Sequence, residues 1–368
     1  MRDPVRHLFL SAARLRQEPE KEGPRSPAER TPSPEEASPW EAAAAIARRV
    51  GQEPIFLHFL RSRFPFAPLA PETLSDLENQ SRFHAFRWLE IRECAESAFD
   101  TLAGRGIRPV LLKGISLAGE CYVPPHLRPM RDIDILVRED EIEDSKAALE
   151  ACGFSSRRED ESSGFFEKHH HLPPLFHAAT GICLEVHHHI MRLPPWFEGF
   201  PEVTEFWKGL RDSAVFPGKA SILDPSLQIL TTSIHITHGD TIGRRAQNII
   251  DLARILELHA ERIDWDRIVR YASSQDTARS LAVSLGYLAR EGLPAAPDDV
   301  LHRLLAASRL NSWEMALLSA LTDRYRIGSP PPWRWVSGRV SNILWRQALR
   351  RGSTSRRIWS TLRQVLKR

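Results

Sequence analysis

The chain has 368 residues, of which 42% are hydrophobic, so it can hold one large domain with additions or more than one domain. Its four cysteines lie far apart and match no zinc or redox spacing, which points to a reducing compartment. No apolar run approaches the roughly 20 residues of a membrane span, so we expect a cytoplasmic protein with no transmembrane segment. The net charge is only +3, although the C-terminal tail is strongly basic, because the rest of the chain is acidic.

The N-terminal part of the chain changes its composition near residue 40. We expect residues 1–39 to form a disordered or weakly ordered segment, because Pro, Glu and Ser dominate residues 16–39 and leave little apolar surface to offset ordering entropy. Residues 40–105 should form a helical region. It contains the strong helix former WEAAAAIARRV and then a longer stretch with apolar positions three or four apart, which ends at Gly104.

Residues 106–222 predict an α/β core. PVLLKG is typical of a short strand entering a glycine, ISLAGECY of a short helix, DIDILV of a second strand, and EDEIEDSKAALEACGF of an amphipathic helix. FFEKHHHLPPLFHA and ICLEVHHHIM predict two further strands with a turn at Thr180-Gly181. This order indicates a small α/β (α+β) unit with a mixed sheet.

The C-terminal part predicts a helical region at residues 223–326 and a basic, Trp-containing tail at residues 327–368. From Arg324 to Arg368 the chain has twelve Lys and Arg residues, no Asp or Glu, and four tryptophans. Such a tail could contact an anionic partner or a membrane surface. The favoured alternative is a helix that docks through its tryptophans and leaves its arginines in solvent, because a run of charges alone is weak evidence for a partner.

Two aspartates, Asp132 and Asp134, lie inside the apolar strand RDIDILV. Alternate side chains of a strand point the same way, so these carboxylates should share one face with their Cα atoms about 7 Å apart. Like charges at that distance repel unless a cation lies between them, and carboxylate oxygens suit Mg²⁺ or Mn²⁺. The alternative is that one aspartate lies at a solvated strand edge while the other caps the chain or pairs with Arg128 or Arg131.

The stretch LLKGIS lies some twenty residues before the aspartates. A strand that runs into a glycine and a helix start is a place where backbone N–H groups can hold a phosphate. Lys113 could add a positive charge beside Gly114, and Ser116 a hydroxyl. The alternative is an ordinary strand-to-helix turn. Arg128 and Arg131 flank the aspartates, and a guanidinium matches phosphate geometry.

LLKG, RDIDILV and the later ICLEVHH, in this order, resemble the nucleotidyltransferase superfamily with the polymerase-beta-like fold. The resemblance is closer to a bacterial branch called uncharacterised nucleotidyltransferases and covers roughly residues 80–280. It implies that Asp132, Asp134 and Glu185 are metal ligands and catalytic residues. It also implies a core flanked by N-terminal helices and a C-terminal helical region.

Histidines cluster near Glu185 in the sequence. His187 shares a strand face with Glu185, and if the two histidine-bearing strands pair, His169 or His171 could approach both side chains. These imidazoles could hold the Glu185 carboxylate in place by hydrogen bonds, bind substrate phosphate or form a transition-metal site. They could also be strand-edge histidines without a role.

A second histidine pair lies in SIHITHG, where His235 and His238 are three residues apart on a predicted helix and share a face. Asp251 follows inside an apolar helical pattern. These residues could line the cleft beside the α/β core, which is what the resemblance implies. The equal alternative is a satisfied buried pair, Asp with His or Arg, that packs one helix on another.

These features lead to a hypothesis of a metal-dependent nucleotidyltransferase. Two Mg²⁺ or Mn²⁺ ions would be held by the three carboxylates, and an NTP, with ATP expected, would donate its nucleoside monophosphate to a hydroxyl of an unknown acceptor, a small molecule or a protein. A weak or inactive binding module is the alternative, favoured by the lysine in the glycine motif and opposed by the three carboxylates. A His-rich metallohydrolase is a third hypothesis. Replacing Asp132 and Asp134 by Asn should abolish activity and leave the fold intact or slightly more stable.

Overall fold

The computed structural model of the protein describes residues 34–157, 170–191, 200–238, 242–311 and 314–315. Most of the expected N-terminal segment and all of the basic tail therefore lie outside the described residues. The chain forms two compact units. Among the described residues, one unit combines residues 34–81, 233–238, 242–261, 272–311 and 314–315, and the other combines residues 82–157, 170–191, 200–232 and 262–271. Helices α4 and α9 each contribute to both units.

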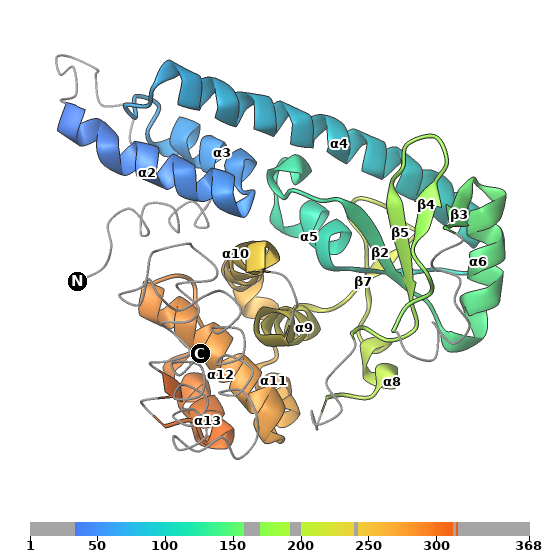
Figure 1. Ribbon diagram of the computed structural model, residues 1–368. Coiled ribbons are helices and arrows are strands. Elements are labelled where there is room, and N and C mark those ends of the chain that lie inside the picture. Colours follow the sequence, from blue (N-terminus) through green and yellow to red (C-terminus); the bar gives the residue numbers. More distant parts are fainter. Residues whose placement is uncertain (1–33, 158–169, 192–199, 239–241, 312–313, 316–368) are drawn as a thin grey trace, which may run out of the picture. The chain divides into compact units, whose positions relative to one another are not determined.

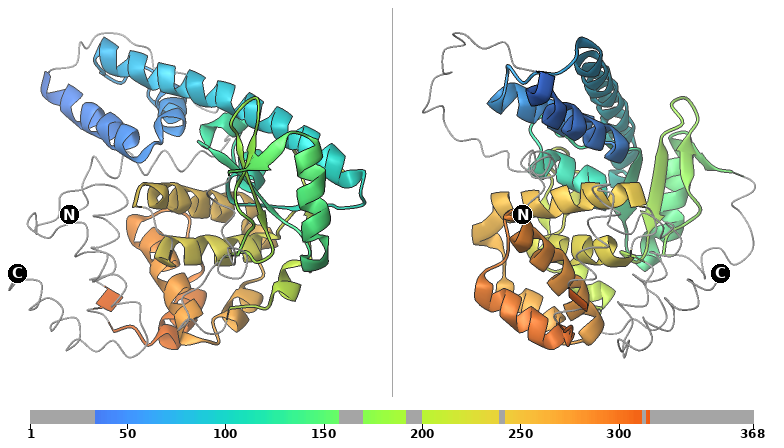
Figure 2. Two further views of the ribbon diagram at one scale, coloured as in Figure 1. Left: turned by 45° about the vertical axis from the view of Figure 1, so that its right-hand side comes forward. Right: turned by 60° about the vertical axis from the view of Figure 1, so that its left-hand side comes forward.

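The first unit is helical in its described part. Its helix α12 begins at the N-cap Ser274, whose hydroxyl accepts a hydrogen bond from Thr277 N, and ends at Gly292 in the left-handed conformation. Helix α12 packs on α13, and α10 packs on α2 and α12 (Figure 2). The elements of this unit are α2 (Pro34–Val50), α3 (Glu53–Arg63), the start of α4 (Pro71–Ala103), the end of α9 (Pro225–His238), α10 (Ile242–His259), a short helix (Ala260–Arg262), α12 (Gln275–Glu291) and α13 (Asp298–Ser308).

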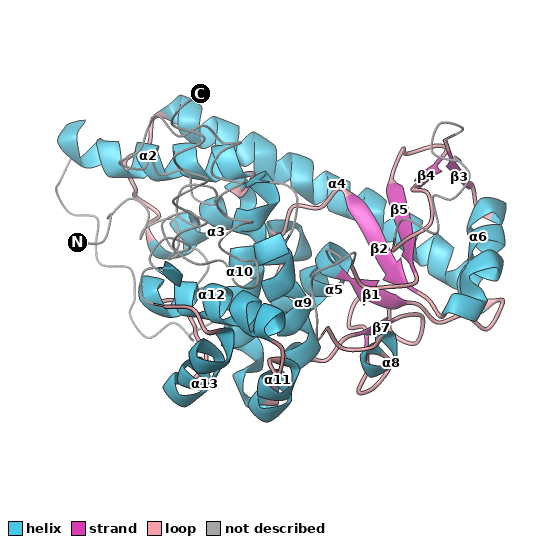
Figure 3. Cartoon of the chain, turned by 60° about the horizontal axis from the view of Figure 1, so that its bottom comes forward, coloured by secondary structure: helices cyan, strands magenta, loops and turns pink. Residues whose placement is uncertain are grey.

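The second unit is built on a seven-stranded mixed sheet with the strand order β3-β4-β5-β2-β1-β7-β6. Strand β2 pairs parallel with β5 and antiparallel with β1, and β1 pairs parallel with β7. Figure 3 shows β1, β2 and β5 side by side. The strands are β1 (Val110–Leu112), β2 (Asp132–Leu136), β3 (Phe154–Ser156), β4 (Leu175–His177), β5 (Cys183–His187), β6 (Arg211–Asp212) and β7 (Ser221–Ile222).

One face of this sheet is apolar and is covered by helices. Ile133 and Ile135 of β2 and Leu184 and Val186 of β5 belong to a buried core that also contains side chains of α4 and α6. Figure 1 shows the ribbons of these strands and helices. The remaining side chains of β2 and β5 point to the opposite face, because neighbours in a strand alternate. The helices of this unit are α4 from Arg82 onward, α5 (Lys113–Cys121), α6 (Ile142–Ala151), α8 (Val203–Phe206), α9 up to Thr232 and α11 (Trp265–Tyr271), with short helices Pro125–Leu127 and Glu139–Glu141.

The expected α/β fold with a mixed sheet is confirmed. The structure adds strands β3, β6 and β7, which the sequence did not predict, and α2 begins at Pro34 rather than near Trp40. The five consecutive segments expected from the sequence, from residues 1–39 to residues 327–368, remain predictions. The two compact units do not test their boundaries, because each unit combines stretches that are separated in the chain. Among the described helices, none combines the length and apolar character that crossing a bilayer requires.

Candidate functional site

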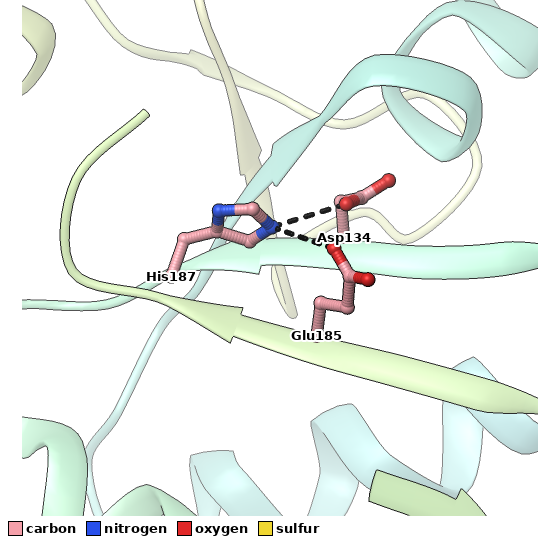
Figure 4. Close-up of side chains that lie close together, drawn as sticks. All are labelled: Asp134, Glu185 and His187. Atoms are coloured by element: carbon pink, nitrogen blue, oxygen red, sulfur yellow. Dashed lines mark hydrogen bonds and ion pairs between the residues drawn. The ribbon is translucent and has the colours of Figure 1, made fainter. Parts of the chain in front are cut away.

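The candidate site lies on the sheet face opposite the helix-covered core. The parallel register of β2 and β5 places Asp134 beside Glu185, and Asp132 beside Cys183. All four side chains point to the same face, because residues two apart in a strand do so. His187 extends the row at the end of β5. Two carboxylates from segments some fifty residues apart in the chain therefore meet on one face, as Figure 4 shows for Asp134 and Glu185.

Asp134, Glu185 and His187 converge. Nε2 of His187 lies 3.0 Å from Oδ1 of Asp134 and 3.4 Å from Oε2 of Glu185 (Figure 4). One ligand atom from each of the three side chains lies within 4.8 Å of the other two. Asp134 and His187 are buried, while Glu185 is partly exposed. Solvent therefore reaches the cluster at Glu185 and not at Asp134 or His187.

Lys113 closes the cluster with a positive charge. Its Nζ lies 2.5 Å from Oδ1 of Asp134 and 3.7 Å from Oε2 of Glu185. The antiparallel register of β1 and β2 places Leu112 beside Asp134, so the next residue begins α5 directly beside the carboxylate. Lys113 adopts a φ of 48°, a left-handed conformation that costs a side-chain-bearing residue energy.

The electrostatics of the cluster follow from this packing. Burial alone would raise the pKa of Asp134, but the Lys113 ammonium and the hydrogen bond from His187 outweigh it and hold the pKa well below its usual range. Burial opposes the charge of Lys113, yet Asp134 and Glu185 raise its pKa. Burial and then the negative charges of Glu185, Asp132 and Asp134 raise the pKa of the Cys183 thiol to about 12. The face is thus a place of negative potential.

The protonation of His187 decides how a cation would be held. Ionised carboxylates only accept hydrogen bonds, so Nε2 of His187, which faces two of them, carries the proton. Nδ1 is buried and has no hydrogen-bond partner among the described residues. A histidine that ligates a metal almost always donates its other N–H to a partner. His187 therefore serves as a donor that orients both carboxylates, and the oxygens of Asp134 and Glu185 fit Mg²⁺ or Mn²⁺.

Asp132 does not belong to the tight group of ligand atoms found among the described residues. It lies on the same face of β2, two residues before Asp134, is half-buried, and contributes to the raised pKa of Lys113. Its role as a third metal ligand stays a prediction.

The turn before α5 carries a second basic group. A Cβ added at Gly114 would lie 2.4 Å from Nη1 of Arg128, so the absence of a side chain lets the guanidinium approach the first turn of α5. Arg128 is 8% exposed, whereas Arg131 is exposed. Ser116 is buried in α5, and its hydroxyl accepts a long hydrogen bond of 3.5 Å from Gln228 of α9. Lys113, Gly114 and Arg128 thus meet at the start of α5.

The predicted strand FFEKHHHLPPLFHA is shorter in the structure, because among its described residues only Leu175–His177 form a strand, β4, and His171 lies before it. His171 forms an antiparallel bridge with His187, and their ring centroids are 5.3 Å apart. Nδ1 of His171 lies 2.6 Å from the carbonyl oxygen of Leu172, so Nδ1 donates and Nε2 keeps its lone pair. Burial lowers the pKa of His171, although Glu185 acts in the opposite direction. His169 lies outside the described residues.

The helical candidates lie in the first unit. His235 and His238 are half-buried in α9, one helical turn apart. Asp251 of α10 is buried and accepts a hydrogen bond of 3.0 Å from Nε2 of Gln247 in the same helix. Their predicted place in a substrate cleft stays a prediction.

Three features of this region are not predicted by the sequence. The first is the contact of Lys113 with the carboxylates, which depends on the β1–β2 register. The others are His84 of α4 and His126, which lie close enough that burial and then the charges of Arg131 and His126 lower the pKa of His84. These residues come from separate segments, and no spacing in the sequence signals their approach.

The fold and the site together define a class of mixed α/β proteins whose central strands present a carboxylate pair and a basic strand-to-helix turn on one face. A model of the family described as uncharacterised nucleotidyltransferase matches residues 36–291, and the chain belongs to this family. No curated protein and no solved structure matches the chain.

Proposed function

We propose that this protein is a metal-dependent nucleotidyltransferase with the polymerase-beta-like core. It moves a nucleoside monophosphate from an NTP, with ATP the expected donor, to a hydroxyl of an acceptor and releases pyrophosphate. The observation that carries the proposal is the convergence of Asp134 and Glu185 under Lys113 and His187, within a chain of this family. Mg²⁺ or Mn²⁺ bound to the carboxylates would neutralise the charge of the reacting phosphates.

The residues of the site take distinct roles in this reaction. His187 keeps both carboxylates in position through Nε2, and Arg128 and the first turn of α5 bind the triphosphate. The acceptor oxygen forms a bond to the α-phosphorus while the bond to the β-phosphate oxygen breaks, and pyrophosphate leaves. The hydroxyl proton passes to Asp132, which is half-buried and can return the proton to solvent.

The test measures label transfer from ATP carrying a label on its α-phosphorus, together with pyrophosphate release, in a panel of hydroxyl acceptors. Asp134→Asn should lower turnover at least about a hundredfold. Loss of a residue that only hydrogen-bonds a metal ligand already lowers activity by up to about a hundredfold, and Asp134 is proposed to bind the metal itself. Glu150→Gln, on the exposed face of α6, should act as wild type. Full turnover of Asp134→Asn would contradict the proposal.

Two other outcomes correspond to the remaining hypotheses. Nucleotide binding without turnover over many acceptors would indicate a binding module. A stoichiometric transition metal other than manganese in the purified protein would indicate a histidine-ligated hydrolase centre, which the donor role of His187 argues against.

A further inference from the structure

The ammonium group of Lys113 lies against the same two carboxylates that the proposed function assigns to a divalent cation. Its Nζ contacts Oδ1 of Asp134 at 2.5 Å and lies 3.7 Å from Oε2 of Glu185. The side chain of Asp134 is 3% exposed and that of Glu185 is 22% exposed. Two carboxylates with so little access to water need a counter-charge, and Lys113 supplies it.

A divalent cation and this ammonium compete for the same place. The ionised carboxylates carry two negative charges, which a divalent cation neutralises by itself. Keeping Lys113 beside that cation would place like charges together in a poorly hydrated environment, where their repulsion is strong. Cation binding therefore requires the ammonium to move.

The backbone and side chain of Lys113 suit such a movement. The left-handed φ of 48° is a conformation that glycine adopts at no steric cost, but glycine would bring no charge. The side chain is 29% exposed and reaches the cluster on a flexible four-carbon stem. It begins α5 beside Gly114 and Arg128, where the proposed phosphates would lie.

We propose that Lys113 is a tethered counter-ion that opposes divalent cation binding at Asp134 and Glu185 until nucleotide phosphates draw the ammonium away. Cation and nucleotide then bind together, and neither binds well alone. This inference rests on the cation site of the proposed function but not on transfer to any acceptor.

Lys219 offers a matched control on the same unit. Its side chain is 31% exposed, close to that of Lys113, and it also lies near two carboxylates, those of Glu96 and Asp100. These partners are 52% and 59% exposed, so water already solvates them. A variant without the Lys219 charge therefore shows the effect of losing a lysine whose carboxylate partners are exposed. The effect of losing the counter-ion of buried carboxylates is then seen by comparison.

The first experiment titrates the full chain with Mn²⁺ and follows free Mn²⁺ by electron paramagnetic resonance, with and without a non-hydrolysable ATP analogue. The Mn²⁺ that the analogue binds by itself is measured without protein and subtracted. Lys113→Met keeps the length of the side chain and removes the charge. It should bind Mn²⁺ alone at least tenfold more tightly than wild type. In Lys113→Met, the analogue should also tighten Mn²⁺ binding by a factor at least tenfold smaller than in wild type. Lys219→Met should match wild type in both Mn²⁺ affinities, with and without the analogue.

The outcomes separate the two proposals. Equal or weaker Mn²⁺ binding by Lys113→Met, with wild type binding Mn²⁺, would overturn the counter-ion role and leave the cation site standing. Failure of both proteins to bind Mn²⁺ with and without the analogue would overturn both.

A second measurement uses the wild-type chain in case Lys113→Met does not fold. Acylation of lysines is followed by mass spectrometry, residue by residue. Lys113 should react slowly in the metal-free protein, several-fold faster when Mn²⁺ is raised to saturation, and slowly again when the ATP analogue is added. Lys219 should react equally in all three conditions. An unchanged rate at Lys113 under saturating Mn²⁺ would contradict the proposal.

Discussion

At the scale of single residues, the ion pair between Lys113 and Asp134 decides what each side chain contributes to stability. The sequence alone suggested that replacing both aspartates by Asn would leave stability unchanged or slightly raised, through lost repulsion. The observed contact of 2.5 Å reverses that expectation for Asp134, because Asn would leave the Lys113 ammonium without its nearest counter-charge.

Asp134→Asn should therefore lower the free energy of unfolding of the metal-free protein by about 1–3 kcal/mol at neutral pH. The loss stays below that of a fully buried pair because Lys113 can turn toward water. Urea unfolding in EDTA measures it. Asp100→Asn, which removes an exposed partner of Lys219, should change stability by less than about 0.5 kcal/mol.

The same substitution should show a defined pH dependence. The pKa of Asp134 is depressed in the folded state, so its contribution is present above the unfolded pKa of about 3.9 and is lost as pH falls through the folded pKa. The stability gap between wild type and Asp134→Asn should be constant from about pH 5 to 8 and shrink steadily below pH 4. A gap that grows on acidification would contradict the assignment of the ion pair.

At the scale of elements, the junction of β1 and α5 brings the basic groups of the site together. Gly114 permits the close approach of Arg128, because a Cβ there would lie 2.4 Å from Nη1 and 2.9 Å from Sδ of Met130. Gly114→Ala should displace the guanidinium and weaken binding of the ATP analogue about tenfold, the loss of a charge-assisted contact.

Calorimetric titration of the analogue measures the effect of Gly114→Ala. Gly286→Ala is the matched control, since Gly286 also lies in a helix and an added Cβ would meet only Cε of Met315 at an ordinary 3.5 Å. It should keep nucleotide affinity and raise stability by up to about 1 kcal/mol through helix propensity. Equal affinity of both variants would place the triphosphate elsewhere.

The sequence predicts those elements whose pattern is local. The alternation in RDIDILV placed Asp132 and Asp134 on one face of a strand, and Glu185 and His187 share a face by the same rule, as the burial of Ile133, Ile135, Leu184 and Val186 on the other face shows. Strands β6 and β7 have two residues each, too few for any periodic signal.

What the sequence could not predict depends on pairing between strands. The contact of Lys113 with Asp134 follows from the antiparallel register in which Leu112 faces Asp134. The approach of Asp134 to Glu185 follows from the parallel register of β2 and β5. Registers are tertiary properties, and a slip of one residue would move every side chain to the other face.

At the scale of the whole molecule, three separated segments contribute the charged groups of one site, and ligand binding should therefore stabilise the second unit as a whole. Mn²⁺ with the ATP analogue at about a hundred times its Kd should stabilise the folded protein by about 2.7 kcal/mol. Thermal unfolding checks this, and Asp134→Asn should gain less than half as much. EDTA should remove the gain from wild type.

In the proposed mechanism, Asp134 and Glu185 hold a divalent cation, and Lys113 yields its place to that cation when nucleotide binds. Crystals of the full chain soaked with Mn²⁺ and the non-hydrolysable ATP analogue test this exchange, because Mn²⁺ is located by its anomalous scattering. The expected result is an anomalous peak within ligand distance of both carboxylates, with Nζ of Lys113 on a phosphate oxygen. A peak elsewhere, or Lys113 still bound to Asp134 beside an ordered nucleotide, would contradict it.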